Sequence, residues 1–493
     1  MVTDRRMALL AEWTGIIVVV LCSPVMLLPK MRWLWLLAVI PLSWLLRLCI
    51  KGSLFEPSPL NSLLLFLVLM IGVSLYATFD IQFSLGKVCG ALLGTFVFLA
   101  LTQFVNTDAR LKWFTGAFLA AGTGLVFIAL IGTAWWAKFG VSAQLVDLLQ
   151  PRFKGLPGAE EGFNPNAIGG SLILFLPLGV TLAAHFIKRE NRRGKAERLL
   201  LGAILFLLLL MGGTLLLSQS RGAWLGFCTA LALFLLLKFR WMWWVGAAAG
   251  ALGALLALIF KPWTGSGQLL ASGLTSGAEI TLQARLEIWS RAVYGIEDFA
   301  FTGMGMNAFR KVVQILYPLF TISPDVDIAH AHNQLLQTAL DLGIPGLVAY
   351  IAIWAAVFRL LWRVWRQSAD PLHRAIALGL TGGLIAQFVF GINDAIALGA
   401  KVGVFWWIAI ALAVSLEKLD RKKVESTDKP KKKTHRAWEI PALWVLTSLL
   451  SISLVGNHPY VALAIAILGG IYLGIEATSI RERQAEQIGV LAP

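Results

Sequence analysis

The sequence predicts an all-α protein that crosses a membrane many times. Of its 493 residues, 58% are hydrophobic and only 14% are charged, whereas soluble domains are about 25% charged. Apolar windows of about 20 residues, the length that a helix needs to cross a bilayer, recur along nearly the whole chain. A membrane β-barrel would instead show short segments of alternating hydrophobicity, which are absent from the sequence. We therefore predict a polytopic α-helical membrane protein.

Hydropathy and length predict roughly 14 spans along the chain. In order, they lie near residues 10–28, 32–50, 60–79, 84–105, 113–135, 167–187, 199–217, 221–238, 242–260, 343–362, 375–392, 401–417, 438–456 and 459–479. The first apolar run is long and no A-x-A cleavage site follows it, so we interpret it as a retained helix rather than a signal peptide.

The positive charges lie between the apolar spans. The formal net charge is +15, but no basic-aromatic module remains once the spans are removed, so we expect no nucleic-acid partner. Basic connections mark the cytoplasmic side of a membrane protein. If Arg5 and Arg6 lie in the cytoplasm, alternation of the spans places both termini and the most basic connections there. These connections are 188–198, 238–240, 363–374 and 421–436.

The same alternation places four segments outside. They are 136–166, 218–221, 261–342 and 393–400. The longest of them is too long for a plain connector. Within it, apolar residues recur at helical spacing, which predicts an amphipathic helix along the membrane surface. These residues are Leu282, Leu286, Trp289 and Val293.

The chain divides into three predicted parts. Residues 1–417 form the main transmembrane domain, which includes the outer segment 261–342. Residues 418–437 form a flexible basic linker in the cytoplasm that can contact anionic lipid. Residues 438–493 hold two additional helices and a tail, for which the sequence suggests no role.

Polar residues gather at the predicted outer ends of the spans. Arg221 follows Ser220 in the turn SQSR. The positive-inside rule disfavours an arginine on the outer side of the membrane, so a functional role for Arg221 is favoured over interfacial anchoring. In the amphipathic helix, Arg285 interrupts the apolar side and is expected to point inward. Arg291 is expected to be more peripheral.

Two pairs of polar residues stand at other outer ends. Asn164 and Asn166 lie in NPN just before a span, where Asn-Pro signals a helix start. Helix capping is their simplest role, and substrate binding is the alternative. Asn393 and Asp394 follow a later span, and either fits a turn.

Two histidines precede the tenth predicted span. His330 and His332 are two residues apart, so on a helix they would point to different sides and would not chelate one metal ion. No other cluster completes a metal site, and the four cysteines lie in apolar segments at unrelated spacings. We therefore expect no metal, no disulfide and no cofactor.

These residue types favour chemistry on a lipid diphosphate. A neutral histidine is a good general base, and the planar guanidinium group pairs with phosphate oxygens. From the residues alone, a membrane transporter is a close alternative. If a histidine acts as the base, activity should fall below about pH 6.5, where an unperturbed imidazole becomes protonated.

Two motifs resemble signatures of the bacterial O-antigen ligase family. The stretch HNQLLQTALDLGIPG fits H-[NSQ]-x9-G-x-x-G, and RGAWL fits R-x3-L. The matched positions are Arg221, Leu225, His332, Asn333, Gly343 and Gly346. The segments 164–166 and 284–309 also resemble this superfamily, and the resemblance extends over roughly residues 60–417.

The resemblance implies a glycosyltransferase C-like enzyme of the bacterial inner membrane with its active site on the periplasmic face. It would transfer a finished glycan from undecaprenyl diphosphate to an acceptor, foremost lipid A–core oligosaccharide, with inversion and without a metal. His332 becomes the base, and Arg221 and Arg285 bind the donor diphosphate. The further candidates for substrate binding are Asn333, Asn164, Asn166, Ser220, His330 and Arg291, with His330 expected to matter less than His332.

Several alternatives stay open. The superfamily also contains glycan polymerases and protein O-oligosaccharyltransferases that use the same donor. The R-x10-G pattern associated with polymerases is not found, because nine residues separate Arg285 from Gly295, which favours a ligase. From another class of protein, a small-anion transporter is the alternative. The two last spans exceed the dozen expected of a ligase.

Overall fold

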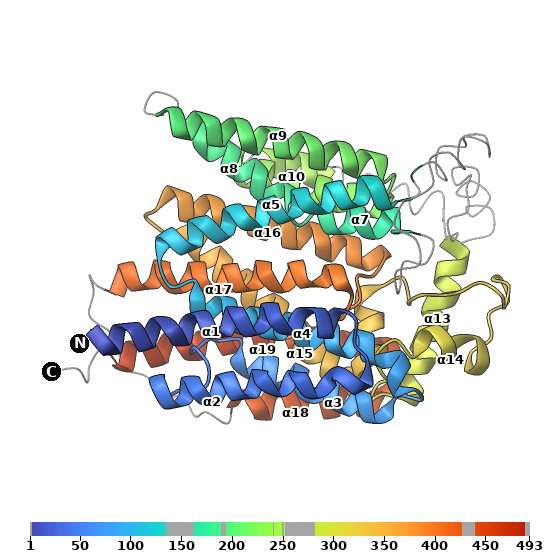
Figure 1. Ribbon diagram of the computed structural model, residues 1–493. Helices are drawn as coiled ribbons and strands as arrows, with labels where there is room; N and C mark the ends of the chain where they lie inside the picture. Colours follow the sequence, from blue (N-terminus) through green and yellow to red (C-terminus); the bar gives the residue numbers. More distant parts are fainter. Residues whose placement is uncertain are drawn as a thin grey trace.

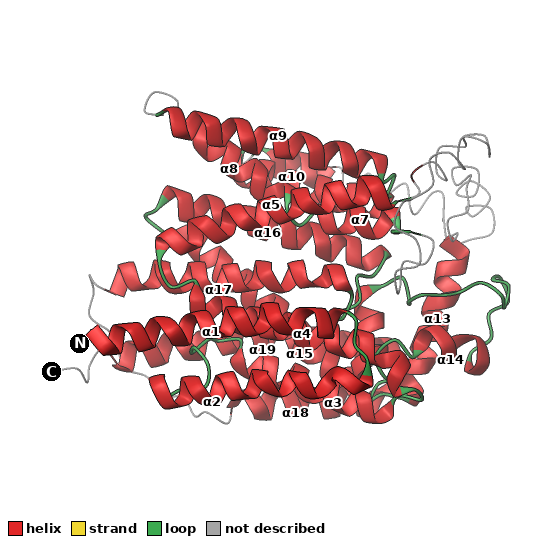
Figure 2. Ribbon diagram, in the orientation of Figure 1, coloured by secondary structure: helices red, strands yellow, loops and turns green. Residues whose placement is uncertain are grey.

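The predicted all-α class is confirmed. The computed structural model describes residues 2–133, 135, 162–188, 194–239, 241–248, 251, 282–425 and 439–488. Within these ranges most residues are helical, and the only bridge between extended segments joins Thr133 to Phe163. Long helices lie side by side in one bundle, and shorter helices cover one of its ends (Figures 1 and 2).

The helices follow the predicted spans closely. They are α1 (Val2–Leu27), η1 (Met31–Ala38), α2 (Val39–Lys51), α3 (Asn61–Ala77), α4 (Ile81–Phe104), α5 (Asp108–Gly132), α7 (Pro165–Leu172), α8 (Leu176–Lys188), α9 (Lys195–Leu217), α10 (Arg221–Lys238), α13 (Leu282–Asp298), α14 (Phe309–Leu316), α15 (Gln334–Gln367), α16 (Pro371–Asn393), η4 (Lys401–Gly403), α17 (Val404–Glu425), α18 (Glu439–Val455) and α19 (Pro459–Ile488).

Ten helical segments in the described residues are long and apolar enough to cross a membrane, and three shorter apolar helices accompany them. These thirteen correspond to thirteen of the predicted spans. The remaining one, at 242–260, lies mostly outside the described residues. The chain is therefore a multi-pass membrane protein.

The connections between helices divide between the two ends of the bundle as the charge pattern predicts. The start of α1 and the end of α19 lie at one end, together with the end of α8, the start of α9 and the α15–α16 connection (Figure 1). The α9–α10 turn, α13, α14 and the segment after α16 lie at the opposite end. We call this second end the outer end. That it faces the periplasm stays a prediction.

Cysteine labelling tests this orientation. In a variant without the four native cysteines, Asp325→Cys should react with a membrane-impermeant thiol reagent in outer-permeabilised cells. Glu190→Cys, in the basic α8–α9 connection, should react only after the inner membrane is opened. Labelling of position 190 and not 325 in intact inner membranes would reverse the orientation.

The predicted amphipathic helix is α13, which runs across the outer end of the bundle (Figure 1). Its buried side differs from the predicted one. Ala284, Ile288 and Ala292 are buried, whereas Leu286 is 44% exposed. The predicted stripe counted only large apolar residues and passed over the two alanines that lie against the bundle.

Helix α15 is interrupted at Gly343. This glycine has φ 68° and ψ 178°, a conformation that is essentially restricted to glycine. A Cβ here would lie 2.2 Å from the carbonyl oxygen of Phe301. The break lets the backbone N–H of Ile344 donate to the Ala300 carbonyl oxygen over 2.8 Å. The first glycine of the histidine motif therefore fixes the segment after α13 against α15.

The linker predicted from residue 418 begins later in the structure. Helix α17 continues to Glu425, and its last turns are tied to other helices. Lys418 pairs with Glu56, and Lys423 pairs with Asp108 over 2.6 Å. The first eight residues of the predicted linker are thus helical, because these charges form ion pairs. Residues 426–438 lie outside the described residues.

The two C-terminal helices pack against the rest of the bundle rather than standing apart. Helix α19 lies along α15 and α18. A Cβ on Gly474 would lie 2.2 Å from the Ala352 carbonyl oxygen, and one on Gly470 would lie 2.9 Å from the Ile351 side chain. Small residues four apart allow such a close approach of two membrane helices. These helices therefore support α15, which carries the histidine motif at its start.

Candidate active site

Strained backbone gathers at the outer end of the bundle. Among the described residues, three that are not glycine have a positive φ, namely Gln219 (46°), Asn307 (72°) and His332 (48°). All three lie in connections of the outer end. Such conformations cost about 1–3 kcal/mol and cluster at functional sites. They point to the region around His332.

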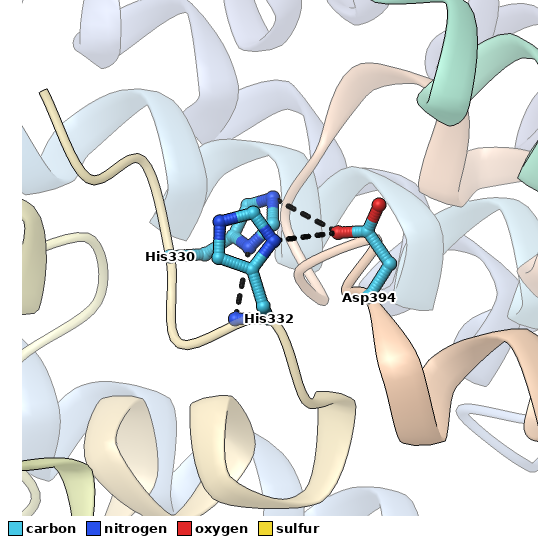
Figure 3. A group of neighbouring side chains, drawn as sticks. All are labelled: His330, His332 and Asp394. Atoms are coloured by element: carbon cyan, nitrogen blue, oxygen red, sulfur yellow. Dashed lines mark hydrogen bonds and ion pairs between the residues drawn. The ribbon is translucent and has the colours of Figure 1, made fainter. Parts of the chain in front are cut away.

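His330 and His332 lie side by side in the loop that precedes α15. Their ring centroids are 4.4 Å apart. The prediction that they point to different sides was wrong, because it assumed a helix, whereas the left-handed backbone at His332 folds the loop back. Both rings face the carboxylate of Asp394, which follows α16 (Figure 3).

One carboxylate oxygen contacts both rings. Asp394 Oδ1 lies 3.3 Å from His332 Nδ1 and 3.5 Å from His330 Nε2. Burial raises the pKa of Asp394, but the close contact with His332, the neighbouring His330 ring and the hydrogen bond from the backbone N–H of Ala395 outweigh burial, so the net pKa is below its usual value. Asp394 is therefore ionised at neutral pH.

The contacts of His330 leave it no free nitrogen. Its Nδ1 accepts a hydrogen bond from the backbone N–H of His332 over 3.2 Å, so we assign the proton of the neutral ring to Nε2, which faces Asp394. Burial lowers the pKa of His330 to about 4, and the charges of His332, Lys87 and Arg285 act in the same direction against that of Asp394. His330 is thus neutral at physiological pH.

His332 has one free nitrogen. Its Nδ1 is buried and has Asp394 as its near neighbour, at an angle outside good hydrogen-bond geometry. A donor N–H at Nδ1 leaves Nε2 with a lone pair, and Nε2 forms no hydrogen bond with any described residue. A carboxylate that fixes the tautomer of a histidine is the arrangement of a general base.

The same three residues could also hold a metal ion. Each of His330, His332 and Asp394 offers one ligand atom, and these atoms lie within 4.8 Å of one another. The sequence-based exclusion of a shared metal therefore does not follow from this geometry. Asp108, Asp370 and His373 form a second such group at the opposite end, where the Lys423 ammonium already neutralises both carboxylates.

A buried hydrogen-bond chain holds the histidine loop. The backbone N–H of Ala331 donates to Gln337 Oε1 over 2.8 Å, and Gln337 Nε2 donates to Asp341 Oδ1 over 2.9 Å. Asp341 Oδ1 also accepts from the backbone N–H of Asn307 over 3.1 Å. Gln337 and Asp341 are 3% and 2% exposed. Satisfied buried networks rigidify their surroundings, so this chain fixes both histidines.

Asn393 lies between Arg285 and the start of α10, the helix that begins with Arg221. Arg285 reaches inward from α13 as predicted, and its Nη1 donates to Asn393 Oδ1 over 2.7 Å. A Cβ on Gly222, next to Arg221, would lie 3.6 Å from Asn393 Nδ2. Arg285 Nε is buried without a hydrogen-bond partner, and exposed Arg221 forms no ion pair with any described residue. Both guanidinium groups retain donors for an anion.

The remaining candidates lie close by with structural contacts of their own. Asn333 caps α15 by accepting from Leu335 and Leu336, and its Nδ2 donates to the Ile392 carbonyl oxygen. Asn164 caps α7 by accepting from the backbone N–H of Asn166, which agrees with the simpler of its two predicted roles. These contacts occupy both ends of the Asn333 amide, whereas exposed Asn164 uses only its Oδ1 and keeps its amide nitrogen for a substrate.

Ser220 and Arg291 also have structural contacts. Buried Ser220 caps α10 by accepting from the backbone N–H of Ala223 over 3.4 Å. Arg291 donates to the Pro318 carbonyl oxygen over 2.9 Å and pairs with Glu287. These contacts attach α13 to the loop after α14. Arg291 is therefore peripheral to the histidines, as expected.

Sequence reasoning missed Asp394 as the partner of both histidines and gave no role to Lys87 and Asp341. The sequence nevertheless contains a feature that could have singled out each of these three residues. Asp394 is an acidic residue at the outer end of a span, and Lys87 and Asp341 are charges within apolar helices, where charge is costly and marks function. Their convergence depends on packing between helices that are far apart in the sequence.

Removing the charge of Asp394 should slow the reaction that this site performs. In Asp394→Asn, the amide can present its N–H₂ group to the histidines and favour the wrong tautomer of His332, so kcat should fall at least about 10-fold. Turnover of purified protein measures this, with Asp325→Asn, an exposed acid at the same end, as the matched control. Equal turnover of Asp394→Asn and wild type would remove Asp394 from the catalytic machinery.

Comparison with known proteins confirms the predicted family. Residues 205–351 match a family described as O-antigen ligase, and this range includes both histidines and both arginines, whereas Asp394 lies beyond it. The chain is also similar to an O-antigen ligase of Pseudomonas aeruginosa, with 28% identity over 178 residues. That stretch covers 36% of this chain and 39% of the relative. Residues 205–351, the part of the chain that carries the two motifs, therefore match the O-antigen ligase family.

Proposed function

We propose that this protein is a glycosyltransferase that transfers a preassembled glycan from undecaprenyl diphosphate to an acceptor hydroxyl at the outer face of the inner membrane. The observation that supports the proposal is the outer-end group of His332, which faces Asp394, and Arg285, which is bound to Asn393 and has a buried Nε without a partner; the start of α10, which carries Arg221, lies next to Asn393. Lipid A–core oligosaccharide is the proposed acceptor. The chain spans about two fifths of the curated relative it matches, so activity, donor and acceptor are all proposals.

In the proposed reaction, His332 Nε2 takes the proton of the acceptor hydroxyl as its oxygen forms a bond to the anomeric carbon. The bond between that carbon and the diphosphate oxygen breaks, and its electron pair leaves with undecaprenyl diphosphate. Arg221 and Arg285 neutralise the charge that develops on this leaving group. Entry of the acceptor opposite the leaving group inverts the anomeric centre. The imidazolium that forms is stabilised by Asp394.

Reconstitution tests this function. Purified protein in vesicles is supplied with undecaprenyl-diphosphate-linked glycan and lipid A–core, and products are separated by gel mobility. One mobility shift of the lipid A–core band supports a ligase. A ladder on the lipid-linked donor identifies a polymerase, and glycan on added protein identifies a protein O-oligosaccharyltransferase. Anion flux without transfer would identify a transporter and refute the proposal.

The same assay decides whether the histidine–aspartate group uses a metal ion. We expect transfer to be unchanged by EDTA, because Asp394 already contacts both rings at distances near those of hydrogen bonds. Loss of transfer in EDTA, with recovery on adding a divalent ion, would assign these three residues as metal ligands.

A further inference from the structure

An apolar groove runs from the middle of the bundle toward the end opposite the outer end. It has a volume of about 590 Å³, and the described residues that line it belong to α10, α15, α16 and α19. Helix α10 packs on α16, α16 packs on α15, and α15 packs on α19, so α10 and α19 form the two walls of the groove. A space of this size accommodates a ligand, and the reaction proposed above does not use it.

The lining of this groove is apolar. Of the lining side chains in the described ranges, Arg359 and Thr381 alone carry a charge or a hydroxyl group, and both are already engaged. Thr381 donates to the Ala377 carbonyl oxygen over 2.8 Å, and Arg359 Nη1 donates to the Ile475 carbonyl oxygen over 2.9 Å. The groove therefore offers few hydrogen bonds to a polar ligand and fits hydrocarbon chains.

Helix α19, for which the sequence suggests no role, supplies one wall. Ile467, Ile471 and Ile475 stand four residues apart and line the groove from one face of this helix. Ile471 is 39% exposed, so the described side chains do not cover this face. The last helix thus adds a wall that is suited to hydrocarbon.

Two arginines mark the end of the groove that lies away from the outer end. Arg366 follows the lining residue Trp362 by one turn of α15, and Arg374 precedes the lining residue Leu378 by one turn of α16. Both arginines are exposed, and neither forms an ion pair or a side-chain hydrogen bond with any described residue. Arg366 lies over the rings of Trp362 and Trp365 at 5.8 and 5.7 Å. The groove therefore ends in positive charge without a counter-ion.

The combination of an apolar groove and basic residues at its end is the pattern of a lipid site. The neighbouring Arg363 pairs with Glu417, so Arg366 and Arg374 differ from it in having no counter-ion. Tryptophan and arginine at the end of a span lie at the level of the lipid headgroups. Basic pockets between membrane helices bind anionic headgroups there. An anionic headgroup at these arginines would leave its hydrocarbon chains beside the groove.

We propose that this groove binds one anionic phospholipid, with its phosphate at Arg366 and Arg374 and its acyl chains against Ile471 and the other lining residues. In the predicted orientation the lipid comes from the cytoplasmic leaflet. The polyprenyl chain of the donor is the competing occupant. It fits less well, because its diphosphate is placed at the outer end and the chain carries no charge for the two arginines. The lipid site does not depend on the transfer reaction.

Native mass spectrometry of the delipidated full chain in detergent tests the headgroup contact. Dioleoyl phosphatidylglycerol should bind to wild type more tightly than dioleoyl phosphatidylcholine, which has the same chains and no net charge. Arg366→Gln and Arg374→Gln should each weaken binding of phosphatidylglycerol about 3- to 10-fold and leave that of phosphatidylcholine unchanged. Arg198→Gln is the matched control, because Arg198 is an exposed arginine near the start of α9, a helix that contributes no described residue to the groove.

A second pair of variants tests the groove itself. Ile471→Trp places a larger side chain in the groove and should weaken binding of both phospholipids about 10-fold, because the acyl chains lose their space. Tyr472→Trp is its control, since Tyr472 is 56% exposed on the same helix and does not line the groove. Should Ile471→Trp elute as an aggregate, Leu237→Trp on the opposite wall replaces it.

Three results would overturn the proposal. Equal affinity of wild type for the two phospholipids, or wild-type affinity in both Arg366→Gln and Arg374→Gln, would remove the anionic headgroup. Wild-type binding in a well-folded groove variant would place the lipid elsewhere. Displacement of bound phosphatidylglycerol by an equal amount of undecaprenol, an uncharged polyprenyl chain, would assign the groove to the donor lipid instead.

Discussion

Replacing His332 with alanine should lower kcat by about 10²–10⁴-fold, the contribution of a positioned general base. A sugar hydroxyl is a poor nucleophile, and His332 Nε2 is the imidazole nitrogen in this site that no described residue engages. Donor affinity should persist, because the proposed diphosphate contacts come from Arg221 and Arg285. Single-turnover rates and donor binding on purified protein separate these two effects.

His330 provides the comparison. Its Nδ1 accepts from the His332 backbone and its Nε2 faces Asp394, so His330→Gln should lose less than His332→Ala, about 10-fold or less. Because burial lowers the pKa of His330 to about 4, the ring is neutral above that pH, and His330→Gln should leave the acid limb of the rate profile in place. A larger loss at His330 than at His332, or normal turnover of His332→Ala, would contradict the assignment of the base.

Replacing Arg285 with alanine should lower kcat/KM for the donor by roughly 30- to 1,000-fold. One charge-assisted contact to the departing diphosphate contributes about 2–4 kcal/mol to transition-state stabilisation. Lysine should restore little of this, because it lacks the two-pronged guanidinium geometry that pairs with phosphate oxygens. Arg221→Ala should have the same effect, because Arg221 begins α10 beside Gly222, which lies close to Asn393, the partner of Arg285.

Arg291 offers a matched comparison on the same helix. Its guanidinium group is bound to the Pro318 carbonyl oxygen and to Glu287, so Arg291→Ala should change donor kinetics far less than Arg285→Ala. Solubilised protein that elutes as a single species in each variant excludes misfolding as the cause. Full activity and donor affinity in Arg285→Ala would show that the diphosphate is bound elsewhere.

The membrane fold was readable from the sequence because each helix carries its own signal. About 20 apolar residues bounded by polar ones define a span whatever its neighbours are. The basic connections 188–198 and 363–374 define a side of the bundle, and their grouping with the termini agrees with the alternation. The α13 stripe was misjudged because Ala284 and Ala292 are buried by their neighbours rather than by their own hydrophobicity.

The residue types of the candidate site could also be read from the sequence. His332, Arg221 and Arg285 stand in short motifs, and the family they indicate is confirmed. Their contacts could not be read in this way. The two histidine rings lie together because the backbone at His332 has a positive φ, and this loop contacts Gln337 through the Ala331 N–H and Trp289 through the His332 carbonyl oxygen.

The sequence by itself determined a polytopic helical membrane protein, the common end of its polar residues and the family to which its motifs point. Only the tertiary structure decided that Asp394 faces both histidines and that Asn393 binds Arg285 beside the start of α10. The physical reason is the distance along the sequence over which each interaction acts. Hydropathy and capping act within one helix, whereas the meeting of α4, α13, α15 and α16 at one end depends on packing between segments that lie far apart in the sequence, from Ile81 at the start of α4 to Asn393 at the end of α16.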